Sequence, residues 1–259
     1  MELITPRLIS ASFRSALALR ATFFLRALLM FANNFIFFVT WIVLFQRVDN
    51  ISGWRLHDVA LVFGISAGSY GIACAILNGF LNLPELISTG ALDSYLLKPF
   101  GLIRLILTSR AEPSAWGDVF SGFVFLHVSG YMSFAMLPTI ALCVLCGAAV
   151  FVASGLIFHS LAFWLQDVDD LASKLWECTI TFSLYPEAIF PLGVRLLLYT
   201  IWPAGLIVFF PCRILREHAP CLFLVLVPAT VLFCLAAFFV FRLGLLRYES
   251  GNRWSVHGV

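Results

Sequence analysis

The residues in this sequence that come nearest to a chemical site lie in a short polar turn, residues 166–174. This turn holds Asp167, Asp169 and Asp170, and three acids within four residues can bind a divalent cation. A metal site needs further acidic or histidine ligands, however, and the sequence offers no second such cluster. Because negative charge favours the N-terminus of a following helix, we interpret these acids as a solvated turn and predict no metal site.

The cysteines are a second group with suggestive spacing. Cys143 and Cys146 form a CxxC pair, but the surrounding ALCVLCGAAV has no histidine or acidic neighbour to complete a redox or metal site. Cys212 and Cys221 bracket a short polar turn, and they can pair only if that turn faces an oxidising compartment. The seven cysteines lie almost entirely in apolar runs, so we expect them to be small packing residues.

Several motifs are absent from the sequence. It contains no GxxxxGK[ST] phosphate-binding loop and only two lysines, so we do not expect the chain to bind ATP through a P-loop of its own. No HExxH motif is present either, and no Ser/His/Asp set stands out. No carboxylate falls clearly at the middle of an apolar run, which argues against proton-coupled transport. We therefore predict a protein that is not an enzyme.

The composition is that of an integral membrane protein. The 259 residues are 61% hydrophobic and 12% charged, with a mean hydropathy of +0.99, whereas a soluble domain carries about 25% charged residues. Several apolar runs exceed the ~20 residues that cross a bilayer as a helix. The alternating pattern of barrel strands is absent, so the spans are predicted to be helices. A formal charge of +2 is too small to indicate nucleic acid binding.

We predict one transmembrane domain over residues 1–259 with six membrane-spanning helices. The first span, 21–45, carries two amides near its middle, Asn33 and Asn34, which are unfavourable in lipid unless they face other helices. The second, 59–80, has small residues at intervals of three and four that can pack against a helix of the same chain or of another subunit. The remaining spans are expected over 116–136, 138–164, a stretch ending near residue 185, and 221–241.

Two further segments are expected to lie at the membrane surface or to cross it incompletely. Arg7, Arg14 and Arg20 share one face of residues 1–20, which indicates an amphipathic helix on an anionic leaflet, with a simple basic tail as the alternative. Residues 186–212 are apolar but contain four prolines. They indicate either broken, half-crossing helices sheltered by protein or a single kinked span.

Residues 83–99, LPELISTGALDSYLLKP, differ from the apolar runs on either side. Pro84 suits the first turn of a short helix and Gly90 its left-handed end. Leu92 and Leu96 then follow at helical spacing until Pro99 ends the second piece. Two short helical pieces with one apolar edge are typical of a segment that lies on a membrane face and binds something outside the bilayer.

The distribution of positive charge orients the chain. With the N-terminus inside and six crossings, eleven of the lysines and arginines fall on the inner side. The five on the outer side are Arg47, Arg55, Arg195, Arg213 and Arg216. This asymmetry agrees with the positive-inside rule and predicts that residues 83–99 and both termini are cytoplasmic.

The order of these elements resembles the ABC-2 type permeases, the membrane subunits of ABC exporters, and most closely the branch of ABC-2 family transporter proteins of about this chain's length. The first matching signature is I-x-x-G-x-L-D-x-x-L-L-x-P over residues 87–99. The second is YPxxIFP over 185–191, followed by Arg195, Pro203 and Pro211. A tail of the form Tyr248-x-Ser250-Gly251 is also similar, whereas Ala91 stands where that branch often has an acidic residue.

The resemblance implies that residues 83–99 are a coupling helix that docks into a groove of an ATP-binding subunit, chiefly through Leu92, Leu96 and Leu97. The implied coupling residues are Glu85, Ile87, Gly90, Leu92, Asp93, Leu96, Leu97, Lys98 and Pro99. Residues 186–212 would be an outward re-entrant hairpin, whose marker residues are Tyr185, Pro186, Pro191, Arg195, Pro203 and Pro211.

The same resemblance implies two permeases, identical or different, with two ATPase subunits in a bacterial inner membrane. ATP and Mg²⁺ would bind the partner ATPase, and this chain would hold no cofactor. The cargo is unidentified, although an apolar outer half fits a lipophilic one. Two alternatives stay open: an ion-coupled secondary transporter, and a membrane enzyme acting on lipid through Asp167, Asp169, Asp170 and a divalent ion.

Overall fold

The structure is a computed structural model that describes residues 20–249, and within these residues it contains helices and turns but no β-strand. The predicted amphipathic helix at 1–20 lies outside the described residues except for Arg20, which begins α2. The tail residues Ser250 and Gly251 lie outside them as well.

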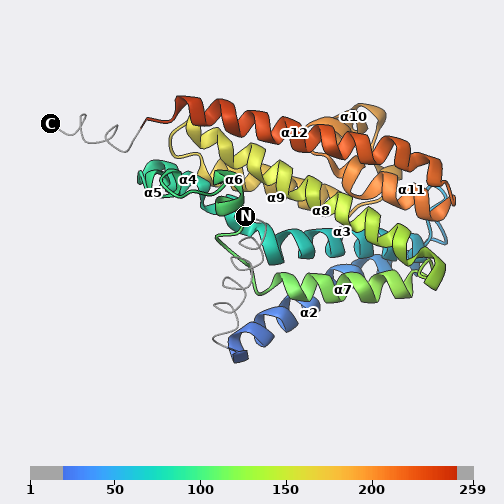
Figure 1. The fold of residues 1–259 in the computed structure, drawn as a ribbon. Coiled ribbons are helices and arrows are strands. Elements are labelled where there is room, and N and C mark those ends of the chain that lie inside the picture. The colour runs from blue at the N-terminus through green and yellow to red at the C-terminus, as the bar shows by residue number, and fades with distance from the viewer. Residues whose placement is uncertain (1–19, 250–259) are drawn as a thin grey trace.

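Four long helices run side by side through the molecule (Figure 1). They are α2 (Arg20–Phe45), α3 (Leu56–Leu77), α8 (Leu137–His159) and α12 (Phe223–Arg247). All four are long and apolar enough to cross a membrane, and a bent pair of shorter helices brings the number to five if it is a single span. The chain is therefore a multi-pass membrane protein.

Two helices of the bundle are shorter than the expected spans. The helix expected over 116–136 is α7 (Ala115–Val128), which ends just before Gly130, a residue in the left-handed region with φ +75°. The helix α9 (Asp169–Ser183) has 15 residues. At 1.5 Å per residue, both fall well short of the ~30 Å hydrocarbon core. The structure thus supports the predicted six spans only in part.

The helix α3 forms the centre of the bundle. Of its most apolar stretch 83% is buried, against 11% for α2 and 17% for α12. Small residues allow this close packing: a Cβ on Gly122 of α7 would lie 2.6 Å from the backbone nitrogen of Gly68. A Cβ on Gly71 would lie 2.6 Å from that of Val119. The small-residue face of the second span therefore packs against a helix of the same chain.

A polar contact joins α2 to α7. The Asn34 side-chain amide donates to the Asp118 carboxylate and to the Ser121 hydroxyl, both at 2.7 Å. Asp118 is buried and lies beside the middle of α2. The sequence indicated no carboxylate at mid-span; the structure corrects this, because the short α7 begins part-way along α2 and brings its first-turn carboxylate with it.

The two ends of the bundle differ (Figure 1). One end carries three short helices, α4 (Leu83–Ser88), α5 (Leu92–Leu96) and α6 (Leu102–Leu107), together with the end of α12. The opposite end carries α10 (Leu192–Thr200), a π-helical turn η5 (Gly205–Phe209) and α11 (Phe210–Arg216). The chain bends by 89° between α10 and the η5–α11 piece. We call these the α4–α6 end and the α10–α11 end.

Candidate functional site

The segment 83–99 forms the two helical pieces that the sequence predicts. Pro84 lies in the first turn of α4, and Gly90, at φ +73°, separates α4 from α5. The Thr89 hydroxyl donates to the Glu85 carbonyl oxygen at 2.7 Å and closes the last turn of α4. The chain leaves α5 at Leu96 and reaches Pro99 in a turn. The segment is thus a compact helical hairpin on the α4–α6 end.

The leucines of the segment divide between the interior and the surface. Leu92 is fully buried with Leu83, in one apolar cluster with Phe163 and with Phe241 of α12. Leu97 is 87% exposed and Leu96 45% exposed. Although the sequence grouped Leu92 with the other two as a contact for a partner, its side chain anchors the hairpin instead. Leu96 and Leu97 form the apolar surface.

The charged and polar residues of the segment are also held in place. The Lys98 ammonium lies 4.5 Å from the centre of the Tyr95 ring, a cation–π contact. Asp93 approaches Tyr248, which follows the last turn of α12. Burial, and then the neighbouring Asp93, raise the pKa of Tyr248 to about 12. The tail residue that marks the family resemblance therefore contacts the first signature.

A phenylalanine connects the segment to the last span. Phe163 closes the short 3₁₀ helix η3 (Ser160–Phe163), and its ring lies 5.6 Å from that of Phe241 and 6.3 Å from that of Tyr248, centre to centre. The backbone of α12 passes so close that a Cβ on Gly244 would clash with the Phe163 ring. The hairpin of residues 83–99, the end of α8 and the end of α12 therefore pack as one unit.

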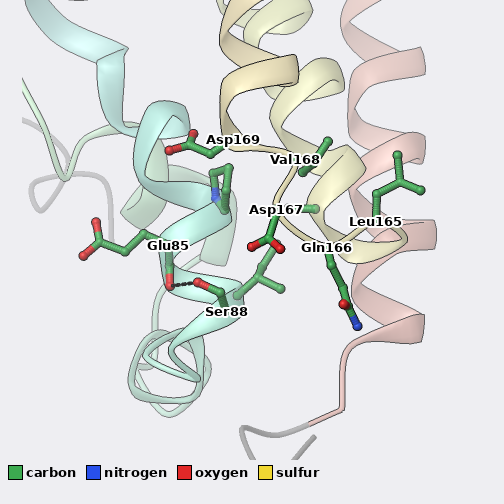
Figure 2. A pocket seen from close by; sticks show the side chains of 10 residues that line it. Glu85, Ser88, Leu165, Gln166, Asp167, Val168 and Asp169 are labelled. Atoms are coloured by element: carbon green, nitrogen blue, oxygen red, sulfur yellow. Dashed lines mark hydrogen bonds between the residues drawn. The ribbon is translucent and has the colours of Figure 1, made fainter. Parts of the chain in front are cut away.

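A cleft of about 470 Å³ separates α4 from the turn between α8 and α9 (Figure 2). Ile87 and Ser88 line it on the α4 side, and Gln166, Asp167 and Asp169 on the turn side. Asp167, whose φ of +48° is left-handed, points toward α4. Two acids of the predicted polar turn, Asp167 and Asp169, thus lie beside the hairpin of residues 83–99. No group of three potential metal ligands occurs among residues 20–249.

The second signature forms the bend at the α10–α11 end. Pro186 and Pro191 have extended backbone before η4 (Glu187–Ile189) and α10. Pro203 precedes η5, and Pro211 lies in the first turn of α11. Each proline occurs at a helix start or a break, where its missing N–H is tolerated. Arg195 in α10 donates from Nε to the Phe190 carbonyl oxygen at 2.8 Å, and the Tyr185 ring packs on Trp41 of α2 at 5.9 Å.

A buried carboxylate at this bend was not assigned a partner from the sequence. Glu187 is only 7% exposed. The Arg213 guanidinium donates to both of its oxygens at 2.7 Å, and the Tyr199 hydroxyl donates to one of them at 3.1 Å. Arg195 lies 4.0 Å away. The contacts join α10, α11 and the turn after α9. The 26-residue separation of Glu187 from Arg213 leaves no periodic signal in the sequence.

The helix α11, which carries Arg213, forms a second ion pair through Arg216. Arg216 donates from Nε to the buried Asp58 carboxylate at 2.8 Å, and its guanidinium stacks on the Trp54 ring at 4.2 Å. The Tyr131 hydroxyl donates to the same oxygen at 2.7 Å. Burial, and then this contact with Asp58, raise the pKa of Tyr131. α11 is therefore fixed to the first turn of α3.

The described residues thus form a multi-pass membrane protein: a bundle of apolar spans with a helical hairpin at one end and a bent, proline-rich segment at the other. A family model described as ABC-2 family transporter protein matches residues 28–252. This match covers most of the chain, and the protein therefore belongs to the ABC-2 transporter family. Searches of curated proteins and of solved structures gave no significant match.

Proposed function

We propose that this chain is the membrane-spanning permease of an ATP-driven exporter, and that a separate ATPase subunit docks on residues 83–99. The observation that carries the proposal is the division of the leucines in this segment. Leu96 and Leu97 are exposed, whereas Leu92 and Leu83 are buried against the bundle. Two neighbouring apolar side chains that stay exposed on a firmly packed hairpin fit a protein-docking surface.

The buried side of the hairpin can transmit a movement of the docked ATPase to the membrane-spanning helices. Leu92 shares its cluster with Ala153 and Leu156 of α8 and with Ala237 and Phe241 of α12. A displacement of α5 therefore presses directly on two spans. An ATP-driven change acts here only if the ATPase contacts the hairpin differently in its two states. ATP and Mg²⁺ bind to the ATPase, and this chain contributes the hairpin of residues 83–99 that transmits the movement to the spans.

The cleft beside α4 extends the proposed docking surface. Asp167 points into it, and Asp169 stands at its edge. A lysine or arginine of the ATPase would find both a carboxylate and the apolar floor made by Ile87 and Val168. Leu96 and Leu97 supply most of the contact energy, and the cleft fixes the orientation of the partner.

In this arrangement the α4–α6 end faces the cytoplasm of a bacterial inner membrane, and both termini lie on that side. The bent segment 186–212 is then an outward re-entrant hairpin, since the end of α9 and the start of α12 both lie near the α10–α11 end (Figure 1). The Glu187–Arg213 ion pair ties the start of this segment to α11, and the Arg216–Asp58 ion pair fixes α11 to α3. The cargo leaves on that side, and the apolar spans fit a lipophilic cargo.

The test is affinity purification of the tagged chain from native membranes. We expect an ATP-binding protein to co-purify in stoichiometric amount, with ATP hydrolysis that vanadate inhibits. Purification of the chain without any ATPase, under detergent conditions that keep the permease folded, would contradict the proposal.

One observation favours a second function, ion-coupled transport. Asp118 is buried beside the middle of α2, and ionisable residues within spans often mark ion pathways. Transport that continues in vanadate and stops with a protonophore would identify this mechanism. The Asn34 contact gives Asp118 a structural role as well, because interhelical hydrogen bonds stabilise helix pairs in lipid.

A further inference from the structure

The first span, α2, leaves most of its surface uncovered. Only 11% of its most apolar stretch is buried. Phe38 and Trp41 on one face pack into the bundle. On the other side Leu29 and Ile36 are 60% and 68% exposed. An apolar face of this kind is ordinarily covered by lipid, and by itself it indicates no protein partner.

Asn33 makes this face unusual. The span runs over Ala21–Phe45, so Asn33 is its thirteenth residue of 25 and lies at its centre. Its side chain is exposed, and it has no hydrogen-bond partner among the described residues. Asn34, one residue later, bonds to α7. An amide facing hydrocarbon loses its hydrogen bonds to water and gains none, so it is stable only where another polar group meets it.

The polar residues of this face recur at an interval of seven. Arg26, Asn33 and Thr40 are each seven positions apart and share one side of the helix. A seven-residue repeat matches the left-handed crossing of two packed helices. The Arg26 guanidinium lies 3.9 Å from the Glu112 carboxylate, and the Thr40 hydroxyl donates to the Phe37 carbonyl oxygen at 2.6 Å. The amide of Asn33 is therefore the polar group of this stripe that lacks a partner within the described part of the chain.

A hollow lies next to the same face. An apolar groove of about 280 Å³ is bordered by Phe37, Thr40 and Leu44 of α2, with Phe63 of α3 and Tyr185 on its other side. It can accept bulky side chains from a helix that crosses α2. The polar stripe and the groove therefore describe a surface shaped for another helix, with its hydrogen-bonding group at the centre.

We propose that this face of α2 is the interface with a second copy of this chain, in which the two Asn33 amides hydrogen-bond to each other across a two-fold axis. An amide is both donor and acceptor, so it is complementary to itself, as an isologous contact requires. The inference rests on the proposed function, because it identifies the surface through which two permeases of one transporter contact each other. Its test measures only the association of two copies of this chain and requires no ATPase.

The experiment is cysteine cross-linking in native membranes with two differently tagged copies of the full chain. Asn33→Cys is compared with Val39→Cys, which is also exposed on α2 but lies on another side, and with Leu232→Cys on the exposed face of α12. The native cysteines that are not buried are replaced by alanine in every variant; they are Cys178, Cys221 and Cys234.

Oxidation is expected to give a dimer carrying both tags for Asn33→Cys and little or none for the two controls. Asn33→Leu is expected to weaken association about threefold to thirtyfold, the range that hydrogen bonds between membrane helices supply. Equal cross-linking at all three positions, or an unchanged dimer in Asn33→Leu, would overturn the proposal. Cross-linking of Asn33→Cys only to a different protein would overturn the assignment of the partner as a second copy.

Discussion

The proposed docking surface depends most on Leu97, which is exposed just after the end of α5, and Leu97→Asp tests this surface. Leu97 is 87% exposed in the chain alone, so its replacement leaves the fold of the permease intact. Full burial of a leucine contributes about 1.5–3 kcal/mol. At 1.4 kcal/mol per tenfold, loss of this burial weakens ATPase binding about tenfold to a hundredfold or more. A carboxylate buried in an apolar groove adds a further penalty.

The assay measures the ATPase that co-purifies with the tagged chain and its vanadate-sensitive hydrolysis of ATP. The matched control is Leu246→Asp, because Leu246 is 85% exposed and lies in the last turn of α12, near the α4–α6 end. We expect a loss of bound ATPase for Leu97→Asp alone, with equal yields of folded permease for both variants. Full ATPase binding by Leu97→Asp would refute the assignment of this surface, as would equal losses for the two.

Three further substitutions test the packing around the site by thermal unfolding in detergent. Leu92→Ala removes a fully buried anchor and is expected to destabilise the chain by about 2–5 kcal/mol, which a Tm unchanged from wild type would contradict. Glu187→Gln removes the charge that pairs with an arginine and is expected to cost about 1–3 kcal/mol, whereas the exposed Glu217→Gln costs little. Gly244→Ala brings a methyl group against a phenylalanine ring and is expected to cost about 1–3 kcal/mol, against little for Gly193→Ala, whose Cβ meets open space; equal Tm values for the two would disprove the close packing.

Composition and local signals predicted much of this structure. The apolar runs located the long helices, since burial in lipid demands about 20 apolar residues in sequence. Pro84 and Gly90 correctly divided segment 83–99 into two helices, because each residue restricts the backbone locally. Signals of this kind need no knowledge of distant parts of the chain.

Features that depend on tertiary packing were beyond such signals. Leu92 and Leu96 are four residues apart and share one stripe, yet only Leu92 is buried, because it joins the apolar cluster of Leu83 and Phe241 and Leu96 does not. The adjacent amides Asn33 and Asn34 likewise have opposite surroundings, since α7 lies on one side of α2 alone. The partner of Glu187 was hidden for the same reason.

In the proposed function an ATPase binds this chain at the exposed end of α5, around Leu97. Its most direct test is a photo-cross-linking amino acid placed at position 97, with position 246 as the matched control, followed by identification of the captured protein. We expect capture of a protein with an ATP-binding phosphate loop from position 97 and not from 246. Capture of no ATP-binding protein at 97, or equal capture at both positions, would contradict it.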